Sequence, residues 1–210
     1  MALVNHSKKW IFFHLYKCGG NSLRDTLNNA FKGQTIEMQG VHNLPKDLKL
    51  DFDNNLGKGV FESYYKFTII RNPFDFYLST YLYCKRFANH FLYNEIHEKN
   101  LTLFDFIATY DRVRNEQRNA QEGTNKVCTL SEYVDDDNGK CLVDYIGRLE
   151  TINESYSDIC KSLGIEKDLV PFKNVNADRS KDYKQYYNEE TINRVTQLFH
   201  KDLERFNYKF

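Results

Sequence analysis

The sequence is poor in the residues that interrupt or cross-link a chain. Its 210 residues include 3 prolines, 10 glycines and 5 cysteines. So few prolines and glycines argue against low-complexity linkers, and we expect a single domain over residues 1–210. The odd number of cysteines, with no C-x-x-C pair, favours reduced thiols over a disulfide framework. A bridge between Cys128 and Cys141, across an expected hairpin, is left open as the alternative.

The sequence also lacks a charge excess and a long apolar segment near its start. Lys plus Arg and Asp plus Glu each number 29, so charge gives no support for nucleic-acid or anionic-membrane binding. The apolar stretch Trp10–Phe13 is too short for a signal peptide or a membrane span. We therefore expect a soluble, cytoplasmic protein with no nucleic-acid partner and no membrane segment in this chain.

Two strand-to-helix junctions stand out among the patterns that are present. Trp10–His14 predicts a buried strand, and after a glycine loop Leu23, Leu27 and Phe31 predict the buried face of a helix. Lys66–Ile70 predicts a second buried strand. The helix after it begins with Asn72 as N-cap, Pro73 at N1 and Asp75 at N3, and we expect it to continue to about Ala88.

Weaker patterns complete an α/β fold with a central, mainly parallel sheet. Asn138-Gly139 predicts a small β-hairpin between Thr129–Val134 and Lys140–Ile146. The other expected elements are a strand over Gln34–Gln39, a helix from about Pro45, helices over Leu101–Tyr110, Ile152–Leu163 and Glu189–Phe206, and a surface loop or frayed helix over Asp111–Lys126.

The glycine loop has the chemistry of an anion site. The backbone N–H groups of residues 19–22 lie at an expected helix N-terminus, where phosphate is bound by N–H donors and by the helix dipole. A Walker A loop has its lysine after the glycines, whereas Lys17 precedes Gly19 and Gly20, and the sequence contains no Walker A pattern. A tight turn without a ligand is the alternative.

Arg71 and Ser79 form a second possible anion receptor. Arg71 leaves the end of a predicted strand, and Ser79 lies seven residues, or two helical turns, beyond Asn72. An arginine fork with a hydroxyl is a good receptor for a terminal phosphate. Taken alone, these residues are better explained as a surface arginine near a helix dipole and a solvated serine.

Four blocks in order resemble sulfotransferases that use 3′-phosphoadenosine-5′-phosphosulfate (PAPS). FFHLYKCGGNSL resembles their 5′-phosphosulfate loop, and FTIIRNPFDFYLSTYLY resembles their 3′-phosphate element. DDDNGKCLVDYIGRLETINESYSDICKSLGI and NADRSKDYKQYYNEETINRV are similar to two later regions of the family. The likeness spans about residues 10–210 and is strongest to the membrane-type carbohydrate branch (heparan- and chondroitin-like) and its bacterial relatives. Tyr16, Asn21 and Phe76 depart from the family pattern, but Lys17 and Arg71 are kept.

The resemblance implies a role for each matching residue. Lys17 is the catalytic residue that neutralises charge on the leaving diphosphate. The loop holds the 5′-phosphate, Arg71 and Ser79 hold the 3′-phosphate, and residues 179–181 close over the nucleotide. The implied PAPS-binding residues are Lys17, Cys18, Gly19, Gly20, Asn21, Ser22, Arg71, Ser79, Arg179, Ser180 and Lys181.

His42 is our choice of general base. It follows the second predicted strand, on the edge of an α/β sheet where ligands gather, and its ordinary pKa near 6.5 suits the task. We expect His14, beside the loop, to have a packing role. Glu150 is the alternative base, although orienting Arg148 suits it better.

The resemblance implies a P-loop NTPase-like three-layer fold and sulfuryl transfer from PAPS, with adenosine 3′,5′-diphosphate (PAP) as product. The acceptor is a hydroxyl or amine, by branch resemblance that of a carbohydrate. No His/Cys cluster has zinc spacing and no acidic residue is placed for magnesium, so we expect no metal. The alternatives are a catalytically silent PAP-binding module and a P-loop phosphotransferase.

Overall fold

The structure is a computed structural model that describes residues 2–38, 44–119, 129–165 and 182–210. Its contacts divide the chain into two compact units. The first unit combines Met1–Arg71 with Leu130–Val175, and the second combines Asn72–Thr129 with Asn176–Phe210. The predicted α/β class is confirmed, because strands and helices alternate along the chain.

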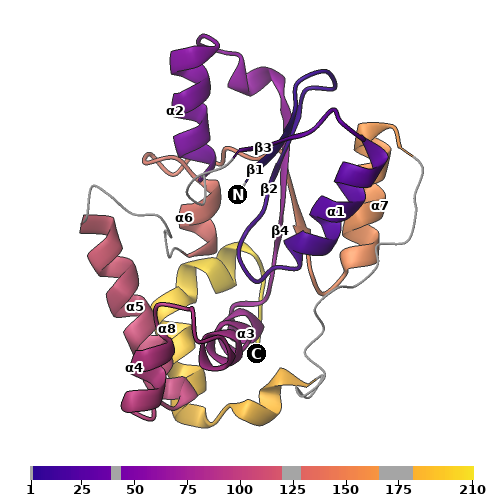
Figure 1. The fold of residues 1–210 in the computed structure, drawn as a ribbon. Coiled ribbons are helices and arrows are strands. Elements are labelled where there is room, and N and C mark those ends of the chain that lie inside the picture. Colours follow the sequence, from indigo (N-terminus) through magenta and orange to yellow (C-terminus); the bar gives the residue numbers. More distant parts are fainter. Residues whose placement is uncertain (1, 39–43, 120–128, 166–181) are drawn as a thin grey trace. The chain divides into compact units, whose positions relative to one another are not determined.

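The first unit contains a five-stranded mixed sheet of order β3-β1-β2-β4-β5 (Figure 1). Its strands are β1 (Ala2–Asn5), β2 (Trp10–Phe13), β3 (Ile36–Met38), β4 (Tyr65–Ile70) and β5 (Tyr145–Arg148). The pairs β2–β4 and β4–β5 are parallel, whereas β1 is antiparallel to both β2 and β3. The expected parallel sheet is therefore present on one side of β2 and is extended by an antiparallel edge.

Helices cover both faces of this sheet, which gives the first unit three layers (Figure 1). On one face α1 (Gly20–Ala30) and α7 (Ile152–Leu163) bury Leu27 and Ile159 against Phe12 and Phe67. Toward the other face, Phe13 packs on Phe61, since side chains alternate along a strand. That face carries α2 (Pro45–Asn55), η1 (Phe61–Ser63) and α6 (Leu130–Val134).

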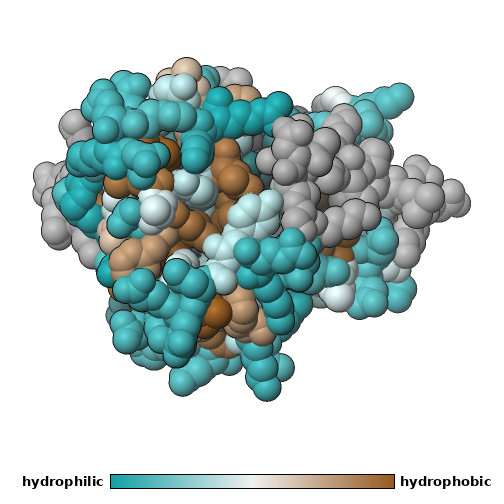
Figure 2. All heavy atoms as spheres, turned by 90° about the horizontal axis from the view of Figure 1, so that it is seen from below, coloured by the Kyte–Doolittle hydropathy of each residue, from teal (hydrophilic) through white to brown (hydrophobic). Residues whose placement is uncertain are grey.

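The second unit is helical. It consists of α3 (Pro73–Arg86), α4 (Tyr93–Glu98), α5 (Leu103–Asn119), η2 (Tyr183–Tyr186) and α8 (Glu189–Arg205). Aromatic side chains make up much of its core: Tyr77 stacks on Phe199 at 4.4 Å and lies edge-on to Tyr110 at 5.5 Å. None of the described helices is both long and apolar enough to span a bilayer. Figure 2 shows one face of the molecule, on which hydrophobic atoms are visible among hydrophilic ones.

The predicted hairpin is wrong. Residues 130–134 form α6, because Leu130, Tyr133 and Val134 are spaced to bury one helix face. The turn at Gly139 exists, but only the bridge between Asp135 and Cys141 joins its two sides. The strand that follows, β5, pairs parallel with β4 instead.

The alternative disulfide is not formed by the residues that the structure describes. Cys18, Cys84, Cys141 and Cys160 are all without a disulfide, and Cys128 lies outside the described residues.

Candidate functional site

The loop between β2 and α1 turns sharply through two left-handed residues. Lys17 has a φ of 57°, which is uncommon for a residue with a side chain. Gly19, the N-cap of α1, has a φ of 74°, a conformation that glycine adopts without steric cost. The turn brings Gly20 and Asn21 into the first turn of α1, where backbone N–H groups have no partner within a helix. This arrangement suits an anion at the start of α1.

Arg71 lies beside this loop. It is the first residue after β4, and β4 is the parallel neighbour of β2, so the two strands end at the same edge of the sheet. Arg71 is only 9% exposed, and its Nη1 donates a hydrogen bond to the Lys17 carbonyl oxygen at 3.0 Å. The structure therefore brings together two of the predicted site residues, Lys17 and Arg71, that are far apart in the sequence.

Both glycines of the loop are packed against neighbouring side chains. A Cβ at Gly20 would lie 2.0 Å from Cδ2 of His14, and a Cβ at Gly19 would lie 2.6 Å from Cδ1 of Leu149. Leu149 follows β5, and its N–H donates to the Ile70 carbonyl at 2.8 Å. The loop is thus enclosed by the residues that follow two further strands, and His14 has the packing role expected for it.

The charges of the loop fit a polyanion. No acidic residue occurs between His14 and Ser22, Lys17 is half-buried, and the side chain of the buried Arg71 donates to the Lys17 carbonyl oxygen. Lys17 Nζ lies 5.8 Å from the centre of the Tyr16 ring. With the first-turn N–H groups, these residues provide the positive charge and hydrogen-bond donors that a phosphosulfate or diphosphate requires.

In the second unit, Asn72 has more partners than the sequence indicated. Its Oδ1 accepts from the Phe74 N–H at 3.1 Å, which confirms the predicted N-cap of α3. Its Nδ2 donates to the Tyr183 hydroxyl at 3.2 Å and to the Lys209 carbonyl at 2.9 Å. One amide therefore links the start of α3 to η2 and to the C-terminal residues. The capping pattern gives no sign of the last two contacts, because they cross more than a hundred residues of sequence.

The remaining predicted residues are not brought to this loop by any described contact. Ser79 lies in α3 of the second unit and is partly exposed. His42, Arg179, Ser180 and Lys181 lie outside the described residues. Glu150, the alternative base, is exposed just after β5.

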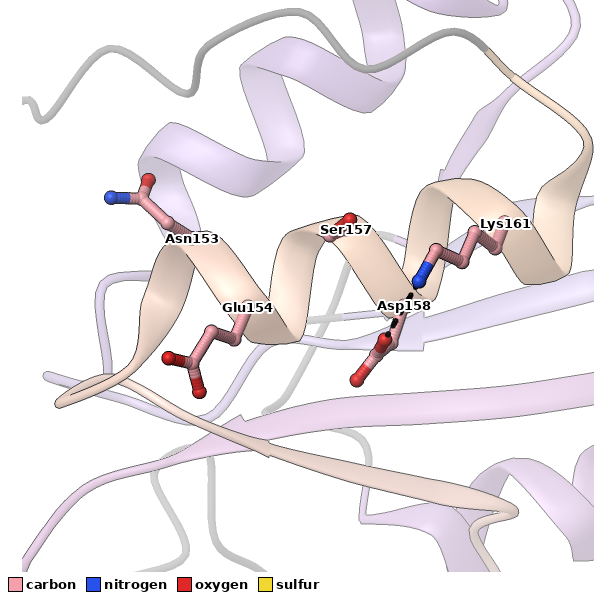
Figure 3. A pocket seen from close by; sticks show the side chains of 5 residues that line it. All are labelled: Asn153, Glu154, Ser157, Asp158 and Lys161. Atoms are coloured by element: carbon pink, nitrogen blue, oxygen red, sulfur yellow. Dashed lines mark ion pairs between the residues drawn. The ribbon is translucent and has the colours of Figure 1, made fainter.

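A shallow depression of about 250 Å³ occurs on the surface of α7 (Figure 3). Its lining residues, Asn153, Glu154, Ser157, Asp158 and Lys161, all come from this one helix. Lys161 Nζ is 3.8 Å from Asp158 Oδ1, so the single cation is already paired with a carboxylate. The depression has the character of a solvated helix face and does not suit a polyanion.

Comparison with known proteins identifies the family of the chain. A model of the sulfotransferase family matches residues 1–209, so the chain belongs to the sulfotransferase family. An uncharacterized protein of Archaeoglobus fulgidus is 30% identical over 129 residues, which make up 60% of this chain and 88% of the relative. No solved structure matches the chain. Membership of the family supports the predicted sulfotransferase and sulfuryl transfer as its reaction.

Proposed function

We propose that this protein transfers a sulfuryl group from PAPS to a hydroxyl or amine of a carbohydrate acceptor and releases PAP. The proposal rests on family membership and, above all, on the hydrogen bond from Arg71 to the carbonyl of Lys17. That bond places a lysine and an arginine at one loop before a helix N-terminus. The P-loop-like character of the fold is part of the same proposal and is supported by the strand, glycine loop and helix of β2 and α1.

Lys17 stabilises the leaving group in this mechanism. Its ammonium group donates to the oxygen that bridges phosphorus and sulfur, where negative charge develops as the S–O bond breaks. The loop from Cys18 to Ser22 holds the 5′-phosphate through backbone N–H groups. Arg71 and Ser79 bind the 3′-phosphate, as the family resemblance implies. The residues involved are cations and neutral donors, so we expect no metal requirement, and chelation of divalent cations should leave the rate unchanged.

The acceptor loses one proton when the new S–O or S–N bond forms. His42 accepts this proton in our proposal, because a general base must be within hydrogen-bond reach of the attacking group. Arg179, Ser180 and Lys181 close over the nucleotide. The family resemblance is the basis for proposing these roles.

The central test replaces Lys17. With ³⁵S-labelled PAPS and a panel of oligosaccharides, Lys17→Ala should lower the transfer rate by about 10²–10³-fold, because the charge of the leaving group is no longer neutralised. Lys9→Ala is the matched control: Lys9 is also a lysine with a positive φ, of 52°, but it lies exposed in the turn between β1 and β2. We expect wild-type rates from the control.

Two outcomes separate the proposal from its alternatives. Unchanged transfer by Lys17→Ala would contradict the mechanism. Tight PAP binding without transfer to any acceptor of the panel would instead favour a silent PAP-binding module. Replacement of His42 by alanine tests the base separately, and its rate should fall most where the acceptor hydroxyl is least acidic.

A further inference from the structure

A surface of aromatic rings lies at the end of α3 and in the turn that leads into α4. It consists of Tyr83, Phe87, His90 and Phe91, and we name it the aromatic platform. The ring centres of Tyr83 and Phe87 are 4.5 Å apart with an angle of 36°, and those of His90 and Phe91 are 4.6 Å apart with an angle of 27°. Tyr83 and His90, whose ring centres are 5.9 Å apart, join the two pairs. The four rings therefore form one continuous surface.

Two of these rings are open to solvent. Phe87 is 41% exposed and Phe91 is 49% exposed, although both are large apolar side chains. Exposure of this kind gives no folding energy, and gathered apolar groups at a surface commonly mark a binding site. Phe87 is tilted against Tyr83 and Phe91 is stacked on His90, so the solvent-exposed side of each phenylalanine ring is available to a flat ligand.

The platform is held in a fixed conformation. The His90 Nδ1 accepts from the Leu92 N–H at 3.2 Å, and its Nε2 lies 3.5 Å from the buried Cys84 sulfur. On α4, the Nε2 of His97 lies 2.8 Å from the Lys85 carbonyl oxygen. A ligand that binds to rings already held in place loses less conformational entropy than one that must order them.

The charge around the platform favours an anionic ligand. No acidic residue occurs between Phe76 and Asn94, whereas Lys85 and Arg86 are exposed beside the rings. The Arg86 guanidinium lies 5.7 Å from the centre of the Phe87 ring. Glu95, the first acidic residue that follows, is already engaged with Lys99 and Arg112.

The open area is small. An aromatic side chain has about 150–250 Å² of surface, so the half-exposed Phe87 and Phe91 together offer about 200 Å². A stable protein–protein interface buries about 1,000 Å² or more. A second copy of the chain is therefore a poor match, whereas one or two sugar rings are a good one.

We propose that the aromatic platform binds the sugar rings of an acidic oligosaccharide acceptor, an inference that rests on the proposed function. One face of a pyranose ring carries C–H groups of slight positive charge, which complement the negative face of an aromatic ring. Lys85 and Arg86 pair with carboxylate groups of the same oligosaccharide. The platform is at the C-terminal end of α3, a helix of 14 residues that spans about 21 Å. In this proposal it contacts sugar rings of the acceptor other than the one that receives the sulfuryl group.

A direct binding experiment tests this without the donor. The probe is an unsulfated hexasaccharide of alternating hexuronic acid and N-acetylhexosamine, titrated calorimetrically. The double variant Phe87→Ala/Phe91→Ala should bind it about tenfold more weakly. Leu50→Ala/Leu56→Ala removes one exposed apolar side chain of α2 and one at its C-cap, 62% and 50% exposed, and should bind like wild type. A neutral hexasaccharide should bind more weakly than the acidic one, and Lys85→Gln/Arg86→Gln should remove that preference.

A kinetic arm separates this inference from the proposed function. The double phenylalanine variant should raise KM about tenfold for the hexasaccharide and leave kinetics with a disaccharide unchanged. Absence of transfer by wild type would count against the proposed function. The calorimetric titration would still test hexasaccharide binding to the platform, because it requires no donor. Equal hexasaccharide affinity of wild type and variant would overturn the inference. Phenylalanine-dependent binding to phosphatidylcholine–phosphatidylserine vesicles without hexasaccharide binding would overturn it too, as would phenylalanine-dependent dimerisation.

Discussion

At the scale of single residues, Lys17 has a left-handed backbone conformation in the loop between β2 and α1. A positive φ costs a residue with a side chain about 1 kcal/mol or more, and surrounding structure must hold it. Lys9, Asn100 and Asn207 also have positive φ values, so the conformation by itself does not identify a site. Lys17 differs in that the buried Arg71 donates directly to its carbonyl oxygen. A side chain proposed to bind phosphate thus also contacts the loop that carries the proposed catalytic lysine.

Gly20→Ala tests how tightly the loop is packed. Alanine normally stabilises a helix relative to glycine by about 1 kcal/mol, but here its Cβ would lie 2.0 Å from the His14 ring. We expect a loss of about 1–3 kcal/mol in the free energy of unfolding, measured by urea denaturation, together with weaker PAP binding.

Two further variants define the cause. Asn29→Ala, at an exposed position of α1, should be neutral or slightly stabilising. The double variant Gly20→Ala/His14→Ala should recover most of the lost stability because the clash is relieved. Full stability of Gly20→Ala alone would show that the loop yields and that the packing is not tight.

At the scale of elements, strong local signals predicted the structure well and weak ones did not. The strand predicted over Trp10–His14 is confirmed as Trp10–Phe13, and the N-cap at Asn72 and the helix Ile152–Leu163 are confirmed as predicted. The hairpin prediction failed because Asn138-Gly139 specifies a turn and not the strands beside it. The strand Ala2–Asn5 was missed since four residues carry too little periodicity, and its pairing with β2 and β3 is a tertiary property.

The sequence predicts a loop or frayed helix over Asp111–Lys126. The helical alternative is correct as far as Asn119, where α5 ends, and residues 120–126 lie outside the described residues. Arg112 donates to Glu116 one turn later, at 2.9 Å, and also to Glu95 of α4. Both charge signs in this stretch indicate a solvated surface, but the Arg112–Glu95 contact uses part of the charge to connect α5 with α4.

The link between α4 and α5 gives a pH-dependent prediction. The hydrogen bond from Lys99 lowers the pKa of Glu95 below its ordinary 4.5, and the charge of Arg112 acts in the same direction, while partial burial opposes both. A lowered pKa means that the ionised carboxylate stabilises the folded state above its ordinary pKa. That contribution is lost as the pH falls through the lowered value. Glu95→Gln should therefore reduce the free energy of unfolding by at most about 1 kcal/mol at pH 7.

Urea denaturation at several pH values checks this prediction. The difference between wild type and Glu95→Gln should shrink as the pH falls below 4.5 and vanish once the wild-type carboxylate is protonated. Glu98→Gln, an exposed position of the same helix, should match wild type throughout. A difference that persists at low pH would mean that Glu95 acts by packing and not by charge.

At the scale of the whole molecule, a net charge of zero conceals local groups of one sign. The loop from His14 to Ser22 and the segment from Phe76 to Asn94 both lack acidic residues. The loop from His14 to Ser22 could be predicted from the sequence, because its glycines and lysine match a family pattern. The contacts of Asn72 with Tyr183 and Lys209 could not be predicted, because they depend on how distant parts of the second unit fold together.

Nucleotide selectivity is the prediction that concerns the whole molecule. A ligand that binds only the folded state stabilises it by about 2.7 kcal/mol at a hundred times its Kd. For a protein of this size each kcal/mol raises Tm by about 2–4 °C, so PAP should raise Tm by about 5–10 °C. ADP and ATP, which lack the 3′-phosphate, should raise Tm only at higher concentration.

Ser79→Ala should reduce the advantage of PAP over ADP, because one donor to the 3′-phosphate is lost. Thr196→Ala removes an exposed hydroxyl of α8 and should preserve that advantage. Equal stabilisation by PAP, ADP and ATP would remove the basis for assigning Arg71 and Ser79 to a 3′-phosphate, and would favour a phosphotransferase over a sulfuryl donor site.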